Sequence, residues 1–284
     1  MGKFMALAEA VAENLKDGDT AVFEGFTHLI PHAAAHEVIR QGRKDLTLIR
    51  MTADLVYDQM VGMGMARKLV FSYAGNPGVG LLRRVRDAVE NGWPNRIDIE
   101  EHSHSAMANA YEAGAAGLPC AFFRGYKGAG LKEVNPNIRS VTCPFTGEEL
   151  AAVPSVRPDA AFIHAQKADR KGNVLIEGIT GVQKEAVLAA KRAVVTVEEI
   201  VDDLAAHPNA CVLPHWTISA ICVVPGGAHP SYVQGYYGRD NASYVEWDRI
   251  AADRDTFNAW MKKNVLDATP EDFAARVVEF SGVA

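Results

Sequence analysis

The sequence predicts an α/β protein with a mostly parallel open sheet and helices on both of its faces. Short apolar segments alternate with amphipathic helical segments along the first half of the chain, which is typical of a parallel sheet. The candidate strands are nearly continuous in apolar residues, as strands covered on both faces must be. The 284 residues, 48% of them hydrophobic, suffice for such a core. We therefore expect a single domain over residues 1–284, with 241–284 forming a helical C-terminal extension.

The elements of the first half follow from periodicity and from residues that begin or end helices. Pro31 stands in the first turn of one expected helix, where the missing N–H has no partner to lose. Asn91-Gly92 is a common helix terminator and ends another. The expected helices are 6–15, 31–41, 56–62, 81–90 and 105–116. The expected strands are 21–23, 46–51, 68–73, 97–100 and 120–123.

The second half continues the alternation. Ala160-Ala161-Phe162-Ile163-His164 has the composition of a buried strand. We expect further strands over 173–176 and 193–197, with a helix over 183–190 between them. The charged tail from residue 241 onward has helical character.

Composition excludes several classes of partner. The formal net charge is −6 and no basic cluster is interleaved with aromatic residues, so we expect no nucleic acid partner. No apolar run approaches the roughly 18 residues of a membrane helix, and the N-terminal residues lack the pattern of a signal peptide. The four cysteines stand in apolar surroundings without Cys-x-x-Cys spacing and are interpreted as buried thiols of a reducing compartment: Cys120, Cys143, Cys211 and Cys222. We therefore expect a cytoplasmic protein.

Known cofactor motifs are absent. The glycines of the 75–80 loop are interrupted by Pro77, so the loop does not match the dinucleotide-binding fingerprint. The chain has neither a phosphate-binding Gly-x-x-x-x-Gly-Lys-[Ser/Thr] loop nor a Gly-x-Ser-x-Gly elbow. We expect no permanently bound cofactor.

Two groups of histidines raise the question of a metal site. His28, His32 and His36 have the i, i+4, i+8 spacing of one helix face, but His28 precedes Pro31 and no series of carboxylates accompanies them. We therefore expect no metal. His102 and His104 follow a strand, and they form either a hydrogen-bonded pair in a loop or a contact to substrate.

The most informative stretch is the end of the first strand. A turn at Asp17-Gly18 leads into the strand, which stops at Glu24-Gly25-Phe26. A glycine at the C-terminal end of a strand lets a ligand approach the backbone, and ligands bind at this edge of open α/β sheets. The peptide N–H groups there can point at an anion or a developing oxyanion.

The stretch Asp17-Gly18-x-x-Ala21-Val22-Phe23-Glu24-Gly25-Phe26 resembles the first signature of family I coenzyme A transferases. The family usually has Gly-Gly-Phe, and Glu24 replaces its first glycine here. Three further stretches, 100–119, 157–173 and 225–237, resemble the A-type subunits of the family. Among these, the chain looks most like the 3-oxoadipate kind, with the glutaconate kind second.

The resemblance implies an enzyme that moves coenzyme A from an acyl-CoA such as succinyl-CoA to a dicarboxylic acid such as 3-oxoadipate. In the family, the thioester is attacked by a glutamate of a partner B subunit, which then carries the coenzyme as a glutamyl-CoA thioester. That glutamate lies in a Ser-Glu-Asn-Gly motif after a strand. Glu90-Asn91-Gly92 follows a helix instead, so we assign no catalytic nucleophile to this chain. Coenzyme A is then part of a substrate, and the B subunit is the expected partner.

The resemblance also suggests the site residues of this chain. The N–H groups of Gly25 and Phe26 would face the reacting carbonyl. Ser72 would donate to the distal carboxylate of the acid, or else it is a strand-end serine bonded to backbone. The remaining candidates for substrate contact are Thr27, Gly75, Asn76, Glu101 and His102.

Alternatives remain open at this stage. Related proteins on this scaffold use a carboxylate of the A-type chain near Glu101 for hydrolysis, so a thioester or carbon–carbon hydrolase is one of them; in an ordinary transferase Glu101 would be an ion pair or cap. A non-catalytic sugar- or effector-binding domain is another. Glu24 either points into a supporting contact or distinguishes the substrate of this subgroup.

Overall fold

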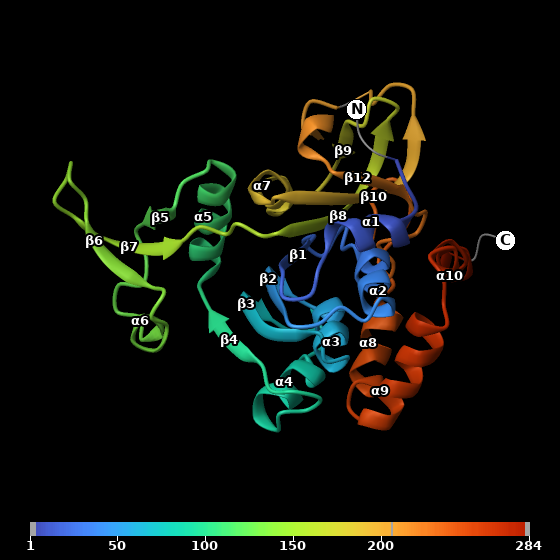
Figure 1. Cartoon of the computed structure of the whole chain (residues 1–284), viewed down its shortest axis with the longest axis horizontal. Coiled ribbons are helices and arrows are strands. Elements are labelled where there is room, and N and C mark those ends of the chain that lie inside the picture. The colour runs from blue at the N-terminus through green and yellow to red at the C-terminus, as the bar shows by residue number, and fades with distance from the viewer. Residues whose placement is uncertain (1–3, 206, 282–284) are drawn as a thin grey trace.

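The structure, a computed structural model, describes residues 4–205 and 207–281 (Figure 1). Its α-helices are α1 (Leu7–Asn14), α2 (His32–Arg40), α3 (Leu55–Gly62), α4 (Arg83–Glu90), α5 (His104–Ala115), α6 (Leu131–Val134), α7 (Gln183–Ala189), α8 (Asn241–Ile250), α9 (Arg254–Met261) and α10 (Asp272–Ser281). A 3₁₀ turn covers His215–Thr217, and a π-helical turn, Lys262–Leu266, continues α9.

Most strands belong to one large sheet. These strands are β1 (Thr20–Glu24), β2 (Leu46–Ala53), β3 (Ala66–Ala74), β4 (Asp98–Glu101), β8 (Ala160–Asp169), β9 (Val174–Ile176), β10 (Arg192–Val201), β11 (Cys211–Leu213) and β12 (Ala220–Val223). Along the sheet the order is β11-β9-β8-β1-β2-β3-β4, and β10 pairs with both β8 and β12. Every pair is parallel except those made by β9. The expected fold class, a mostly parallel open sheet, is confirmed.

Helices cover both faces of this sheet because its strands alternate their side chains. On β1, Phe23 packs with residues of α1 to α4, α8 and α9, whereas Val22 packs with residues of α5 and α7. Both side chains are fully buried. The nearly continuous apolar strands therefore reflect two covered faces, as the composition predicted.

A small antiparallel sheet forms an arm that projects from the body (Figure 1). It consists of β5 (Cys120–Phe123), β7 (Glu149–Pro154) and β6 (Arg139–Thr142), in that order. The sequence predicted only β5. Strands β6 and β7 are short and partly exposed, so they lack the apolar run that marks a buried strand. Phe145, in the turn between them, is 93% exposed.

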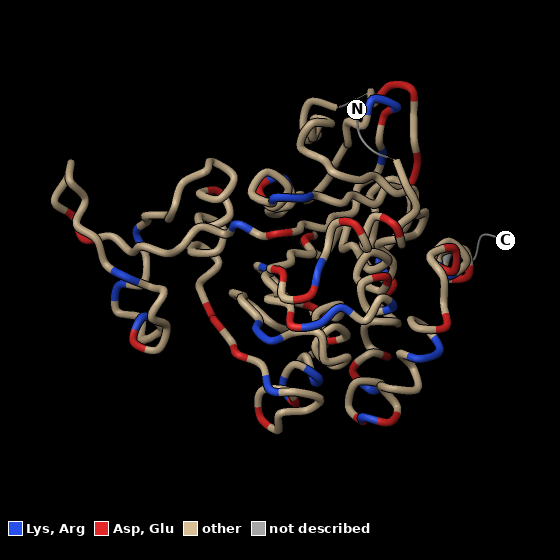
Figure 2. Tube along the Cα trace, in the orientation of Figure 1, with Lys and Arg blue, Asp and Glu red and all other residues tan. Residues whose placement is uncertain are grey.

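Residues 241–281 contain α8, α9 and α10, and α8 and α9 pack on the body beside α2 and α3 (Figure 1). The buried carboxylate of Asp58 on α3 joins α8 to the core: it accepts the backbone N–H groups of Arg84 and Val85 and the indole N–H of Trp247. Charges of both signs are intermixed along the chain (Figure 2). No described helix has the length and apolar content required to cross a membrane.

Candidate functional site

The loop that leaves β1, residues 25–30, turns back sharply on itself. A Cβ placed on Gly25 would lie 2.6 Å from the carbonyl oxygen of Leu29 and 2.7 Å from that of His28. Thr27 and Leu29 have φ angles of 57° and 55°, a left-handed conformation that non-glycine residues adopt rarely. Gly25 is therefore required for space, and the surrounding structure must hold the loop in a strained conformation.

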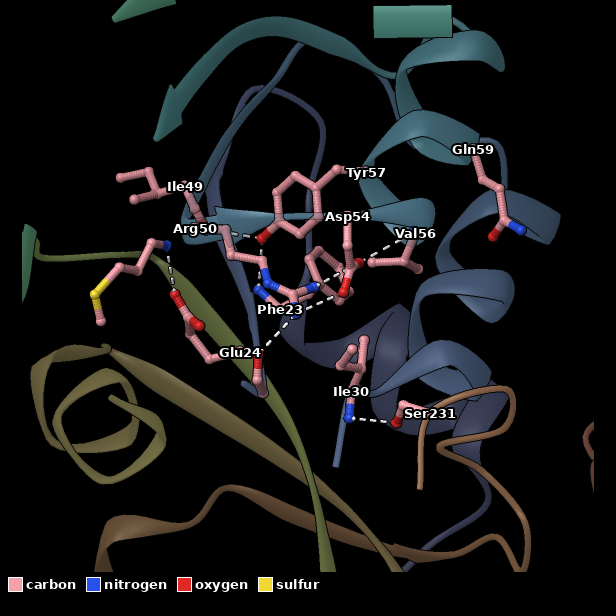
Figure 3. A network of polar contacts seen from close by, with 12 residues as sticks. Phe23, Glu24, Ile30, Ile49, Arg50, Asp54, Val56, Tyr57, Gln59 and Ser231 are labelled. Carbon is pink, nitrogen blue, oxygen red and sulfur yellow. Dashed lines mark hydrogen bonds and ion pairs between the residues drawn. The ribbon is translucent and has the colours of Figure 1, made fainter. Parts of the chain in front are cut away.

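A buried arginine on the neighbouring strand holds the start of this loop (Figure 3). Arg50 on β2 is 1% exposed, and its guanidinium binds both carboxylate oxygens of Asp54 at 3.0 Å. The same group donates to the carbonyl oxygen of Gly25 at 2.7 Å. Two charges removed from water are stable only when they are paired and hydrogen-bonded, and here both terminal nitrogens of Arg50 are bonded, whereas its Nε has no partner among the described residues. The pair therefore fixes the backbone at the point where the loop leaves the strand.

Glu24 points into a supporting contact. It is 3% exposed, and one carboxylate oxygen accepts the N–H of Met51 at 3.0 Å and the hydroxyl of Tyr111 at 2.6 Å. Burial raises the pKa of Glu24, while Arg50 and these hydrogen bonds oppose the rise. The backbone N–H of Gly25 is one of the groups that stabilise this carboxylate. The first of the two roles considered for Glu24, support, is therefore the one that the geometry favours.

His28 ties the loop to two distant segments. Its Nδ1 lies 3.2 Å from the carbonyl oxygen of Ile179, and its Nε2 accepts the backbone N–H of Gln234 at 3.0 Å. The first contact requires a donor and the second an acceptor, so the imidazole is neutral with its proton on Nδ1. Burial lowers the pKa of His28 and favours this neutral form. His28 lies outside α2, in the loop before Pro31, as the sequence analysis expected.

Residues 231 and 232 provide further anchors for the same loop. The N–H of Ile30 donates to the hydroxyl of Ser231 at 3.1 Å (Figure 3), and that of Leu29 donates to the carbonyl oxygen of Tyr232. A Cβ on Gly181 would lie 2.9 Å from the side chain of Phe26, so a third segment packs against this residue of the loop. Loop 25–30 is thus enclosed by parts of the chain about 150 to 200 positions away.

Two residues of the loop retain unused donors. Phe26 and Thr27 are partly exposed. Among the described residues, neither the N–H of Phe26 nor the hydroxyl of Thr27 has a hydrogen-bond partner. The loop therefore presents a backbone donor and a hydroxyl at the carboxyl edge of the sheet. Gly25 itself is buried against the carbonyl oxygens of Leu29 and His28, so its missing side chain makes room for the loop's own backbone and not for a ligand.

The candidates that follow β3 are held more firmly than the sequence suggested. The hydroxyl of Ser72 donates to the carbonyl oxygen of Met51 at 2.6 Å, so its proton is committed to backbone. Asn76 is 1% exposed and its amide donates to the carbonyl oxygen of Tyr244 at 2.7 Å, which ties the loop to α8. Gly75 is buried, and its N–H donates to the carbonyl oxygen of Ala53. These three residues support the shape of the edge.

Glu101 and His102 have different surroundings although they are adjacent. Glu101 ends β4 with an exposed side chain. His102 is 5% exposed and its Nε2 lies 2.8 Å from a carboxylate oxygen of Glu100, which also binds Lys68 at 2.6 Å. The hydrogen bond from His102 lowers the pKa of Glu100 to about 2. His102 is thus bonded to Glu100, whereas His104 begins α5 and is exposed.

Sequence reasoning missed the residues that position the loop. Arg50, Asp54, Tyr111 and the segment around Gln234 were not predicted to have a role. One signal was available, because a charged residue inside an apolar strand such as 46–51 is rarely buried without a partner. Glu90 lies in the last turn of α4 and pairs with Arg86, which agrees with the helix-end interpretation. Among the described residues, no three His, Cys, Asp or Glu side chains are grouped to hold a metal ion.

A family model and two similar relatives identify one family for this chain. A family model described as coenzyme A transferase matches residues 4–223. The chain is 63% identical to the A subunit of 3-oxoadipate CoA-transferase from Pseudomonas knackmussii, over 98% of this chain and 99% of that protein. It is 32% identical to the A subunit of glutaconate CoA-transferase from Acidaminococcus fermentans, over 96% and 90% of the two chains. The crystal structure of glutaconate coenzyme A-transferase from that organism matches with a TM-score of 0.89 and 31% identity, over 98% of this chain and 93% of the other.

Proposed function

The chain belongs to the coenzyme A transferase family, and on this premise we propose that it is the A subunit of a 3-oxoadipate CoA-transferase. The observation that carries the proposal is the 63% identity to the A subunit of such an enzyme, which extends across almost the whole of both chains. Glutaconate, the acid named for the more distant relative, is the alternative acceptor.

The proposed reaction needs a partner B subunit. Its glutamate carboxylate attacks the thioester carbonyl of succinyl-CoA, and the coenzyme leaves as thiolate, so that a mixed anhydride forms. The thiolate then attacks the glutamyl carbonyl and releases succinate, which leaves a glutamyl-CoA thioester. The carboxylate of 3-oxoadipate attacks this thioester, and return of the thiolate to the new anhydride yields 3-oxoadipyl-CoA and free glutamate. Coenzyme A is therefore a substrate moiety, and no resident cofactor is required.

Loop 25–30 would contribute to this reaction as a donor surface. Each step places negative charge on a carbonyl oxygen. A backbone N–H that already points at this oxygen stabilises the charge without any reorganisation of the protein. The unpartnered N–H of Phe26 is the first candidate. The N–H of Gly25 is the second, although it also stabilises Glu24. Thr27 is proposed as the donor to the distal carboxylate of the acid in place of Ser72, whose proton is already engaged.

The remaining expected contacts are proposed in indirect roles. Gly75 and Asn76 would shape the edge of the acid site from behind, and Glu101 would lie at its rim with His102 beneath it. A cytoplasmic location, expected from the sequence, stays a prediction.

The test is co-expression with a B-type partner that carries a Ser-Glu-Asn-Gly motif, followed by an acyl-exchange assay of the purified complex. We expect transfer from succinyl-CoA to 3-oxoadipate, with a higher kcat/KM than for glutaconate. A well-formed complex that transfers to neither acid would refute the proposal, and faster release of coenzyme A to water would identify a hydrolase.

A paired substitution tests the roles within the loop. Thr27→Val should raise KM for 3-oxoadipate about tenfold, because a dicarboxylate loses one hydrogen bond to a charged group. The same change should leave transfer to a monocarboxylic acid such as acetate unaltered. Ser72→Ala is the matched control and should change neither KM. If Ser72→Ala raised KM for 3-oxoadipate but not for acetate, and Thr27→Val changed neither, then Ser72 and not Thr27 would be the donor to the distal carboxylate.

A further inference from the structure

A cavity of about 470 Å³ lies between the body and the C-terminal extension, on the side of the sheet that α2 and α3 cover. Its walls come from α2, α3, the segment around His229, α8, the end of α9 and α10. These helices surround the region at the right of Figure 1, where α10 lies beside α2. The volume falls in the range of roughly 300–1,000 Å³ that is typical of small-molecule sites.

One wall carries a positive charge without a countercharge. Arg276 on α10 is partly buried and donates to the carbonyl oxygen of Asn264 at 2.8 Å. Among the described residues, no carboxylate lies within ion-pair distance of it. Burial lowers the pKa of Arg276, and Asp272 compensates only in part from a distance. A desolvated guanidinium favours a carboxylate that can bind both of its edges.

Two histidines on α2 add unpaired polar atoms to the same cavity. His32 is fully buried, and neither of its ring nitrogens has a hydrogen-bond partner among the described residues. His36 binds Gln59 through Nε2 at 2.8 Å, while its Nδ1 has none. Burial lowers the pKa of His36 to about 3, so the ring is neutral at pH 7. Buried polar atoms of a native protein are normally paired, so atoms left unpaired beside a cavity indicate that a further group belongs there.

The rest of the lining suits an apolar body. Trp247 and Trp260 meet edge to face with ring centroids 5.2 Å apart, and Phe280 of α10 also lines the cavity. The acidic residues that line the cavity do not neutralise Arg276. Asp240 is bound to His229 and Ser243, and both Glu246 and Glu279 are exposed. The interior therefore combines aromatic walls with a guanidinium that has no carboxylate partner among the described residues and an imidazole, that of His32, whose ring nitrogens have no hydrogen-bond partner there.

We propose that this cavity is a second ligand site, which binds a small organic carboxylate with an aromatic or other apolar body. The carboxylate would pair with Arg276 and accept from His32, and the body would pack between Trp247, Trp260 and Phe280. The site shares no residue with loop 25–30, so it does not depend on the transferase assignment. Because α10 supplies Arg276 and Phe280, the ligand would also hold this helix against the body.

The test is a titration of the full chain with sodium benzoate, followed by calorimetry and by tryptophan fluorescence. Two of the four tryptophans, Trp247 and Trp260, line the cavity, so binding should change the emission. We expect saturable binding of benzoate, with benzamide about tenfold weaker or worse because it lacks the charge. Absence of saturable benzoate binding, or equal affinity for benzamide, would overturn the proposal and leave a cavity that holds only water.

Substitutions locate the binding. Arg276→Gln should weaken benzoate binding at least about tenfold. Arg249→Gln, which removes an exposed arginine of α8 outside the cavity, should leave it unchanged. Trp260→Phe should reduce the fluorescence response without abolishing the calorimetric signal. Circular dichroism checks that α10 stays folded, and Arg276→Lys, which keeps the charge, should retain intermediate affinity. Unaltered binding in Arg276→Gln would refute the site.

Discussion

Two arginines of this chain that are shielded from water have opposite surroundings. Arg50 is fully enclosed behind loop 25–30, with a bidentate bond to Asp54 and a third bond to the carbonyl oxygen of Gly25. Arg276 is partly buried in the wall of the C-terminal cavity and has a single carbonyl acceptor. The comparison distinguishes a guanidinium that has a carboxylate countercharge from one that has none within ion-pair distance among the described residues. The first rigidifies a site from within, and the second suits a partner that comes from outside.

The largest expected effect follows from breaking the Arg50 pair. Arg50→Met leaves the carboxylate of Asp54, 2% exposed, without its cation, and should lower the free energy of unfolding by about 3–5 kcal/mol. Urea denaturation measures this loss. Arg83→Met is the control, because Arg83 pairs with Asp248 at the surface, where a salt bridge contributes about 0–1 kcal/mol. Equal losses in the two variants would show that the Arg50 pair does not stabilise the fold.

Gly25→Ala should be next in size. The new methyl group would meet the backbone carbonyls of Leu29 and His28, which cannot rotate away, so we expect a loss of about 3 kcal/mol, at the upper end of overpacking. The rate of coenzyme A transfer by the complex with a B subunit should also fall. Gly238→Ala adds the same methyl group where no atom lies within 4 Å, and it should be nearly neutral. An unchanged kcat in Gly25→Ala would show that loop 25–30 does not take part in the reaction.

The buried imidazole of His36 should make the stability of the protein depend on pH. His36 has a folded pKa of about 3, below its unfolded value of about 6.5, so the unfolded chain binds more protons between these values. Stability from this residue is therefore complete above pH 6.5 and is lost as the pH falls, by about 2 kcal/mol at pH 5. His36→Gln should flatten this slope, whereas substitution of the exposed His104 should not. If the free energy of unfolding fell equally steeply with pH in wild type and in His36→Gln, His36 would not be the residue responsible for the pH dependence.

The smallest expected effect concerns the support of Glu24. Tyr111→Phe removes one hydrogen bond to its carboxylate, while the N–H groups of Met51 and Gly25 remain, so we expect a loss of about 1 kcal/mol. Thermal unfolding of Tyr111→Phe beside wild type measures it. Substitution of Tyr73, which is 44% exposed, by Phe provides the control. A loss confined to Tyr73→Phe would mean that Glu24 is not the group that Tyr111 supports.

The sequence by itself determined the alternation of strands and helices, the helical tail and the turn at Glu24-Gly25-Phe26. These features are local: apolar period, a terminating Asn-Gly and a glycine at a strand end act over a few residues. The arm was only partly predicted, because its strands β6 and β7 are short and partly exposed and so carry no apolar run.

Only the tertiary structure decided how the loop is held and which donors remain free. Glu24 meets Tyr111 across 87 positions, and His28 meets Ile179 and Gln234 across 151 and 206. Arg50 finds its countercharge only four positions away, in Asp54, but the carbonyl oxygen of Gly25 that it also binds comes from the loop after the neighbouring strand, 25 positions away. No local sequence pattern predicts the contacts of Glu24 and His28, because strand order and the packing of helices on the sheet bring these distant residues together.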